Sequence, residues 1–116
     1  MDYIPDRFDI IYLDLDPQLG TEINKRRPCL VMSTAGFNQK SRKAFICPIT
    51  SALPRSAAHI IFEGQKIKGT ILVDQLRSLD WISRKAQKVD HLSDMKIYER
   101  ISNIIQAIIT GREWYK

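Results

Sequence analysis

The hydrophobic period of the chain changes near its C-terminal end, and this change constrains the fold more than any other feature. Through most of the chain, short β-branched and aromatic runs alternate with segments rich in Gly, Pro and polar residues, a pattern typical of short strands. Near the end, isoleucines recur at positions 97, 101, 104, 105 and 108, as on the apolar face of a helix. This order predicts an antiparallel sheet, curled into a small barrel, with a C-terminal helix packed on it.

Composition and turn residues place the elements along the chain. We expect extended segments at Phe8–Leu15, Cys29–Ser33, Ala44–Ile49, His59–Phe62, Thr70–Val73 and Leu76–Leu79. Residues 34–42 read as a turn or a short helix, and residues 64–69 as a basic turn. We expect the C-terminal helix to begin at an N-cap Ser93, with Asp94 in its first turn, and to end at Gly111.

Length and composition indicate one globular domain over residues 1–116. Hydrophobic residues make up 44% and charged residues 27%, which is ordinary for a folded protein and argues against disorder. The formal net charge of +5 favours an anionic partner, either a nucleic acid or an acidic protein.

The cysteines and the apolar runs bear on cofactors and location. Cys29 and Cys47 each lie inside an apolar run and are expected in the core, since they belong to no cluster able to complete a zinc site. The acidic N-terminal segment shows no signal peptide, and no apolar run is long enough to cross a bilayer. We therefore expect a cytoplasmic protein without a cofactor.

Two groups of titratable residues are candidates for chemistry. His59 and His91 are a possible acid–base pair, but nothing in their spacing brings them together, so surface or capping roles are favoured. Four aspartates are candidates for a carboxylate metal site, yet no supporting motif accompanies them: Asp14, Asp16, Asp74 and Asp80.

The segment 17–27 is a long predicted loop, and loops of such length are often functional. It ends in three cations, Lys25, Arg26 and Arg27, directly before Pro28. An arginine fixed at a strand end suits a phosphate, because its planar guanidinium donates to two oxygens and keeps its charge.

Other cations and aromatic residues extend this pattern to a nucleic acid. Lys40, Arg42, Lys43 and Arg55 lie in neighbouring polar segments, where they could follow a phosphate backbone. Tyr12, Phe37 and Trp81 are candidates for stacking on bases, with a core position as the alternative.

An ordered set of short motifs resembles the MazF/PemK family of toxin endoribonucleases. The set consists of Gly20-Thr21-Glu22, Arg27-Pro28, Ser33 to Asn38, Pro48-Ile49-Thr50 and Asp74-Gln75. The similarity to the family covers the chain from about Ile4 to about Gly111. The resemblance implies an SH3-like (CcdB/PemK-like) barrel with a C-terminal helix, usually a homodimer. It also implies metal-independent, sequence-selective cleavage of single-stranded RNA such as mRNA, and neutralisation by an acidic antitoxin.

The resemblance also assigns roles to residues. It places the catalytic arginine at Arg27 and the catalytic threonine at Thr50. Arg26 also lies close to Pro28, so it is the alternative position for the catalytic arginine. RNA-binding positions follow from the resemblance and from the basic loop: Thr21, Glu22, Lys25, Arg26 and Gln75.

Two alternatives remain open. One is a gyrase-poisoning toxin of the same fold. Toxins of that kind lack the Arg-Pro and Pro-x-Thr motifs found in this sequence, and their C-terminal residues differ from residues 113–116 of this chain. The other is a nucleic-acid-binding barrel without catalysis, which basic loops and aromatic residues fit equally well.

Overall fold

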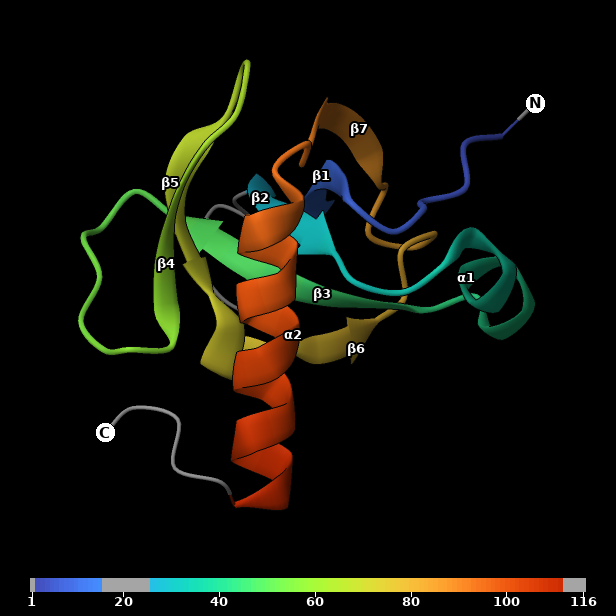
Figure 1. The fold of residues 1–116 in the computed structure, drawn as a ribbon. Coiled ribbons are helices and arrows are strands. Elements are labelled where there is room, and N and C mark those ends of the chain that lie inside the picture. The colour runs from blue at the N-terminus through green and yellow to red at the C-terminus, as the bar shows by residue number, and fades with distance from the viewer. Residues whose placement is uncertain (1, 16–25, 112–116) are drawn as a thin grey trace, which may run out of the picture.

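The computed structural model describes residues 2–15 and 26–111. Figure 1 shows a curled sheet with one long helix running across it and projecting beyond its edge. The strands are β1 (Asp9–Asp14), β2 (Arg26–Val31), β3 (Ala44–Thr50), β4 (His59–Glu63), β5 (Lys68–Leu72), β6 (Arg77–Leu79) and β7 (Gln87–His91). The helices are α1 (Ala35–Ser41), the 3-10 turn η1 (Val73–Gln75) and α2 (Met95–Thr110).

Strand β3 organises the sheet. The strands follow the order β4-β5-β3-β2-β1-β7, every pair is antiparallel, and β6 pairs with β3. Residues 44–46 of β3 pair with β6, and residues 49–50 of β3 pair with β5. Pro48 lies between these two paired segments. The predicted curled antiparallel sheet with a C-terminal helix is confirmed.

The sheet buries side chains on both faces because successive residues of a strand point to opposite sides. Ile10 belongs to the cluster beneath α2, which includes Ile101, whereas Ile11 belongs to a second cluster around Trp81. Cys47 belongs to the cluster beneath α2, and Cys29 belongs to the cluster around Trp81. Burial raises the pKa of each thiol to about 12. Their predicted place in the core is confirmed.

Helix α2 is capped at both ends. Its N-cap is Asp94 and not the predicted Ser93, because the Asp94 carboxylate accepts a hydrogen bond from the backbone N–H of Lys96. Gly111 ends the helix as predicted, at φ 83°, a conformation that glycine adopts without steric cost. Among the described residues, no helix is long and apolar enough to cross a membrane.

The predicted bounds of strands were wrong where residues without an apolar pattern become a strand by pairing with a neighbouring strand. Strand β2 begins at Arg26 and not at Cys29, because Arg26, Arg27 and Pro28 all pair with β1. Strand β7 was not predicted at all, since its sequence is polar and its residues are half-buried or exposed. It forms because β1 offers it a free edge.

The carboxylate of Asp90 ties β7 to the β4–β5 hairpin. It accepts hydrogen bonds from the backbone N–H groups of Lys66 at 2.7 Å and Ile67 at 2.8 Å. A Cβ at Gly64 would lie 2.6 Å from the same carboxylate, so only glycine allows this approach. The two ends of the strand order are thereby connected, which curls the sheet.

Candidate active site

Arg27 and Thr50 line the same surface depression, although they come from different strands. Arg27 is exposed near the start of β2, and Thr50 is the last residue of β3. Both residues, with Ile49, line each of two neighbouring hollows of about 350 and 440 Å³. We call the two hollows together the Arg27–Thr50 groove.

The first hollow brings in residues from β5, η1 and β6. Its lining is Leu15, Arg27, Pro48, Ile49, Thr50, Leu72, Gln75 and Arg77. The second hollow extends toward the β4–β5 hairpin, and its lining is Tyr12, Arg26, Arg27, Pro28, Ile49, Thr50, Ser51, Lys66, Ile67 and Lys68. Gln75, a predicted RNA-binding residue, therefore lies in the same hollow as both predicted catalytic residues.

The groove is strongly cationic. Its lining contains five cationic side chains, Arg26, Arg27, Lys66, Lys68 and Arg77, and no carboxylate from the part of the chain that the structure describes. Because clustered charge of one sign in a concave surface raises the local concentration of the opposite charge, this groove suits a polyanion. The Thr50 hydroxyl accepts a hydrogen bond from the backbone N–H of Ala52 at 3.2 Å, which leaves its own O–H available to donate.

Arg26 differs from its neighbour because the protein itself uses its guanidinium. Nη1 donates to the Asp14 carboxylate at 2.9 Å, and Nη2 donates to the backbone oxygens of Tyr12 and Lys85. Arg84 adds to this anchoring by donating to the backbone oxygens of Asp14 and Leu15. These contacts fix the strand ends that flank Arg27.

Three predicted site residues, Thr21, Glu22 and Lys25, lie outside the described residues, as does Asp16. In contrast, sequence reasoning did not assign Arg77, Lys66 and Lys68 to the site. Lys66 and Lys68 were recognised only as part of a basic turn, and Arg77 only as part of the extended segment Leu76–Leu79. What places them in the groove is the pairing of β5 and β6 with β3.

The two histidines are engaged with separate carboxylates. His59 Nε2 lies 3.2 Å from Asp74, and His91 Nδ1 lies 3.3 Å from the buried Asp9. The structure brings neither histidine into the groove lining, which agrees with the favoured sequence interpretation.

The aspartates proposed as metal ligands are dispersed. Asp14 pairs with Arg26, Asp74 pairs with His59, and Asp80 accepts hydrogen bonds from the backbone N–H groups of Ile82 and Ser83. Within residues 2–15 and 26–111, no group of three or more His, Cys, Asp or Glu side chains is arranged to hold a metal ion.

Of the aromatic residues considered for base stacking, only Tyr12 lines the groove. Trp81 is 8% exposed and donates its indole N–H to the backbone oxygen of Asn38. Phe37 packs edge-on against Phe45, with ring centroids 5.7 Å apart. The candidate cations Lys40, Arg42, Lys43 and Arg55 lie outside the groove lining as well.

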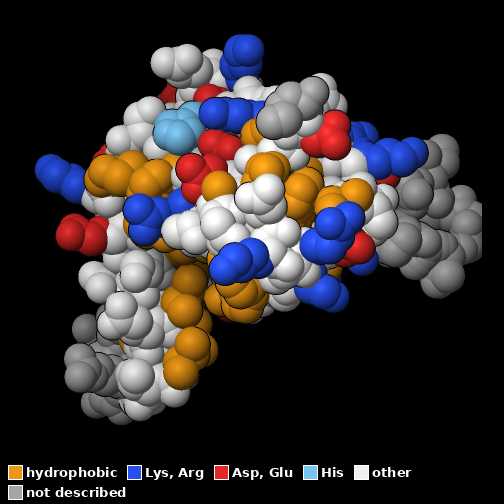
Figure 2. All heavy atoms as spheres, turned by 90° about the vertical axis from the view of Figure 1, so that its right-hand side faces the viewer, with side chains coloured by type: hydrophobic (Ala, Val, Ile, Leu, Met, Phe, Trp, Pro, Cys, Tyr) orange, Lys and Arg blue, Asp and Glu red, His pale blue; other side chains and the backbone are white. Residues whose placement is uncertain are grey.

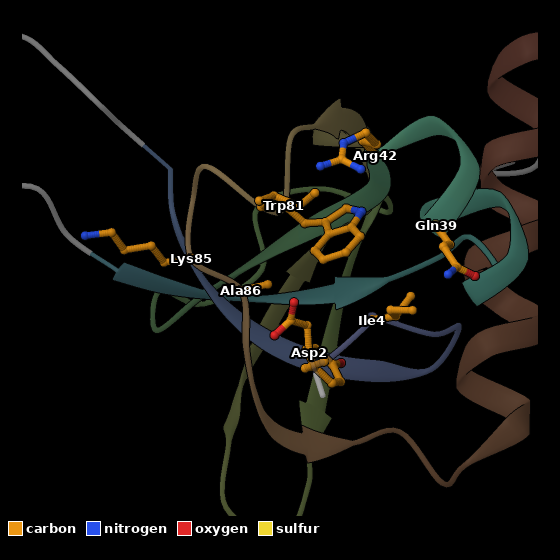
Figure 3. Close-up of a pocket in the computed structure, with 9 residues that line it drawn as sticks. Asp2, Ile4, Gln39, Arg42, Trp81, Lys85 and Ala86 are labelled. Carbon is orange, nitrogen blue, oxygen red and sulfur yellow. The ribbon is translucent and has the colours of Figure 1, made fainter.

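A larger cavity of about 510 Å³ shares no lining residue with the groove. It lies between the N-terminal segment, α1 and the turn that precedes β7, and Figure 3 shows the Trp81 indole among its lining side chains while Lys85 points away. Its lining includes the stacking candidate Trp81 and the candidate cation Arg42, but none of the described residues predicted to be catalytic or RNA-binding: Arg26, Arg27, Thr50 and Gln75.

Comparison with known proteins accounts for this arrangement. Residues 6–109 match the family model described as a PemK-like, MazF-like toxin of a type II toxin-antitoxin system. The chain is 34% identical to the endoribonuclease toxin MazF of Escherichia coli over 86 residues, which cover 74% of this chain and 78% of that protein. It is 29% identical to the endoribonuclease PemK of Escherichia coli over 108 residues, which cover 86% of this chain and 81% of that protein.

A solved structure agrees over the whole fold. MazF in the crystal structure of MazE-MazF from Deinococcus radiodurans matches with a TM-score of 0.85 and 29% identity, covering 97% of this chain and 100% of that chain. With an apolar sheet that curls beneath one helix, and with Arg27, Thr50 and Gln75 meeting in a cationic groove, the chain belongs to the PemK/MazF family of toxins of type II toxin-antitoxin systems.

Proposed function

We propose that this protein is the toxin of a type II toxin-antitoxin system and cleaves single-stranded RNA at selected sequences without a metal ion. Two relatives, 34% and 29% identical to this chain over 86 and 108 residues, are named endoribonucleases. The observation that carries the proposal is the shared position of Arg27 and Thr50, both of which line each hollow of one cationic groove. Cleavage of mRNA by such an enzyme would inhibit translation and growth.

The proposed reaction needs charge stabilisation more than covalent chemistry. The RNA 2′-oxygen attacks the adjacent phosphorus, loses its proton and forms a 2′,3′-cyclic phosphate. The bond to the 5′-oxygen breaks, and that oxygen takes up a proton and leaves as a hydroxyl, so that no net proton is gained or lost. Negative charge grows on the non-bridging phosphate oxygens as the reaction proceeds. Arg27 would donate to those oxygens and Thr50 would donate beside it, so both contacts strengthen in the transition state.

Arg27 is not assigned as the base that removes the 2′-proton, because a guanidinium stays protonated in proteins. Gln75 lies beside the two catalytic residues and would contact an RNA base, since its amide both donates and accepts hydrogen bonds. Thr21, Glu22 and Lys25 remain proposed RNA-binding residues. For Arg26, three hydrogen bonds within the protein favour an anchoring role, although its side chain also lines the groove.

Incubation with a long single-stranded RNA in EDTA tests the proposal. We expect cuts at a recurrent sequence, with a cyclic phosphate on one fragment and a 5′-hydroxyl on the other. Thr50→Ala should lose cleavage while it keeps most RNA affinity, and Thr110→Ala, an exposed threonine at the end of α2, is the matched control. If Thr50→Ala cut RNA at the wild-type rate, the catalytic assignment would be wrong.

The same experiment separates the two alternatives. A barrel that only binds nucleic acid would leave RNA intact in the wild type as well as in Thr50→Ala. A gyrase-poisoning toxin would leave RNA intact and block supercoiling by gyrase. The family match and the endoribonuclease relatives favour RNA cleavage over both.

The partner proposed for this toxin is an antitoxin whose acidic segment covers the groove. A net charge of +5 and five cationic side chains in the groove would attract such a segment, most strongly at low salt. An antitoxin bound there would compete with RNA. A toxin–antitoxin complex that cleaved RNA at the full rate would contradict this.

We also propose that the toxin is a homodimer. An apolar hollow between β3 and α2 is lined by Met32, Ser33, Phe37, Phe45, Leu76 and Ile105. Ile108 and Ile109 are 49% and 76% exposed on the last turns of α2. Figure 2 shows hydrophobic side chains along the edge of the projecting helix. A second copy would cover this surface, and exposed apolar area of this kind favours association.

A further inference from the structure

We propose that His59 is a positioning residue that holds Gln75 at the Arg27–Thr50 groove. The inference rests on the proposed function, because it concerns how the same groove holds RNA. It starts from a side chain that lies outside the groove lining yet connects two of the segments that border it.

Two polar contacts hold the imidazole in place. His59 begins β4, and its side chain is 13% exposed. Nδ1 lies 3.1 Å from the backbone nitrogen of Arg55, whose N–H can only donate, so Nδ1 is the acceptor. In the neutral ring Nε2 therefore carries the proton, and it lies 3.2 Å from a carboxylate oxygen of Asp74. Both ring nitrogens are used, which suits a structural tie and not a proton shuttle.

The two partners of His59 belong to segments next to the groove. Asp74 is the central residue of η1, and the next residue, Gln75, lines the hollow that contains Arg27 and Thr50. Arg55 belongs to the loop that leaves the groove after Thr50. One imidazole therefore fixes the 3-10 turn that presents Gln75 relative to the loop that follows the catalytic threonine.

Few internal contacts hold the 3-10 turn itself. Its N-terminal end has no side-chain cap, and at its C-terminal end the N–H of Leu76 bonds to Val73. A backbone bond from the Val73 N–H to Ala58 attaches the start of the turn to the residue before His59. Turns of this kind have poor hydrogen-bond geometry. The contact between His59 Nε2 and Asp74 therefore supports the part of the turn that carries Gln75.

Two conservative substitutions separate the contact with Arg55 from the contact with Asp74. His59→Gln places an amide near the position of Nε2, where it can donate to Asp74, but it lacks the acceptor for Arg55. His59→Asn places an amide oxygen near the position of Nδ1, where it can accept from Arg55, but it does not reach Asp74. The two variants are similar in polarity, and they differ mainly in whether they keep the contact with Asp74 or the contact with Arg55.

Steady-state cleavage of a short RNA that contains the recognised sequence tests the inference. We expect His59→Asn to raise KM about five- to tenfold, the loss typical of one ordinary polar contact within a protein, with kcat within about twofold of the wild type. His59→Gln should keep a near-normal KM. Thermal unfolding of both variants, at similar Tm, shows that neither effect comes from loss of the fold.

A double-mutant cycle with Gln75→Ala completes the test. If His59 acts through Gln75, adding His59→Asn to Gln75→Ala should not raise KM further. Additive effects, equal KM values for the two His59 variants, or an unchanged KM in His59→Asn would overturn the inference. Failure of the proposed function is distinguishable, because then the wild type itself would not cleave the RNA.

Discussion

The guanidinium of Arg26 lies 2.9 Å from the carboxylate of Asp14, and the two residues are register partners in the β1–β2 ladder. The neighbouring Arg27 is paired with the fully buried Leu13, and its guanidinium belongs to the groove. Adjacent arginines on one strand thus have different surroundings. Both line the groove, but the Arg26 guanidinium also anchors the end of the β1–β2 hairpin.

This difference predicts opposite outcomes for one substitution at two positions. Arg27→Gln should lower the rate of RNA cleavage about 10²- to 10³-fold with little change in stability, because it removes a donor to the developing charge. Arg26→Gln should lower the free energy of unfolding by about 1–3 kcal/mol, because three hydrogen bonds are lost at a partly exposed site. Chemical denaturation and single-turnover cleavage measure the two effects, with Arg100→Gln on α2 as the control. The assignment of the two arginines would be wrong if the outcomes were exchanged.

The cationic groove predicts a strong salt dependence of RNA binding. With the Thr50→Ala protein, which we expect to bind RNA without cleaving it, the logarithm of affinity should fall linearly with the logarithm of salt concentration, by about 0.7 for each phosphate that is neutralised. Lys66→Ala should reduce that slope by about 0.7, because Lys66 lines the groove. Lys40→Ala, which removes an exposed cation of α1 outside the groove, should leave the slope unchanged. Equal slopes for all three proteins would remove Lys66 from the binding surface.

The tie between Asp90 and the β4–β5 hairpin predicts a pH-dependent stability. Burial tends to raise the pKa of Asp90, but hydrogen bonds from the backbone N–H groups of Lys66, Ile67 and His91 outweigh it and hold the pKa below its usual value of 3.8. A carboxylate with a lowered pKa stabilises the fold fully above that usual value, and the contribution is lost as the pH falls through the lowered pKa.

Asp90→Asn should therefore be less stable than the wild type at pH 6, and the difference should shrink as the pH falls below about 4. Urea unfolding at several pH values measures it. Amide hydrogen exchange should also become faster at Lys66 and Ile67, since their N–H groups lose a charged acceptor. A stability difference that did not change between pH 6 and pH 2.5 would contradict the assigned role of the carboxylate.

The apolar surface beside α2 predicts dimerisation through that helix. Ile108→Lys should shift the mass measured by light scattering from that of a dimer toward that of a monomer, because the helix end would carry a charge into the interface. Ile61→Lys, at a position 64% exposed on β4, is the control and should leave the mass unchanged. A dimer that persists in Ile108→Lys would place the interface elsewhere.

Elements that bury apolar side chains were predictable from the sequence, and an element without such side chains was not. Strand β3 and helix α2 carry their own periodic apolar pattern, which the sequence displays directly. Strand β7 carries none, and it exists because β1 has an edge to which it can pair. The start of β2 at Arg26 has the same origin, since pairing with Asp14 extends the strand into residues that read as a loop.

The sequence by itself determined the barrel-and-helix architecture, the buried cysteines and the candidate pair Arg27 and Thr50, because hydrophobic periodicity and ordered short motifs are properties of neighbouring residues. Only the tertiary structure decided which cations join that pair. Arg77 and Lys66 come into the groove through the pairing of β6 and β5 with β3, while Arg26 turns to Asp14. Which cations line the groove depends on pairing between strands that are distant in the sequence, and the local hydrophobic pattern of a sequence does not reveal that pairing.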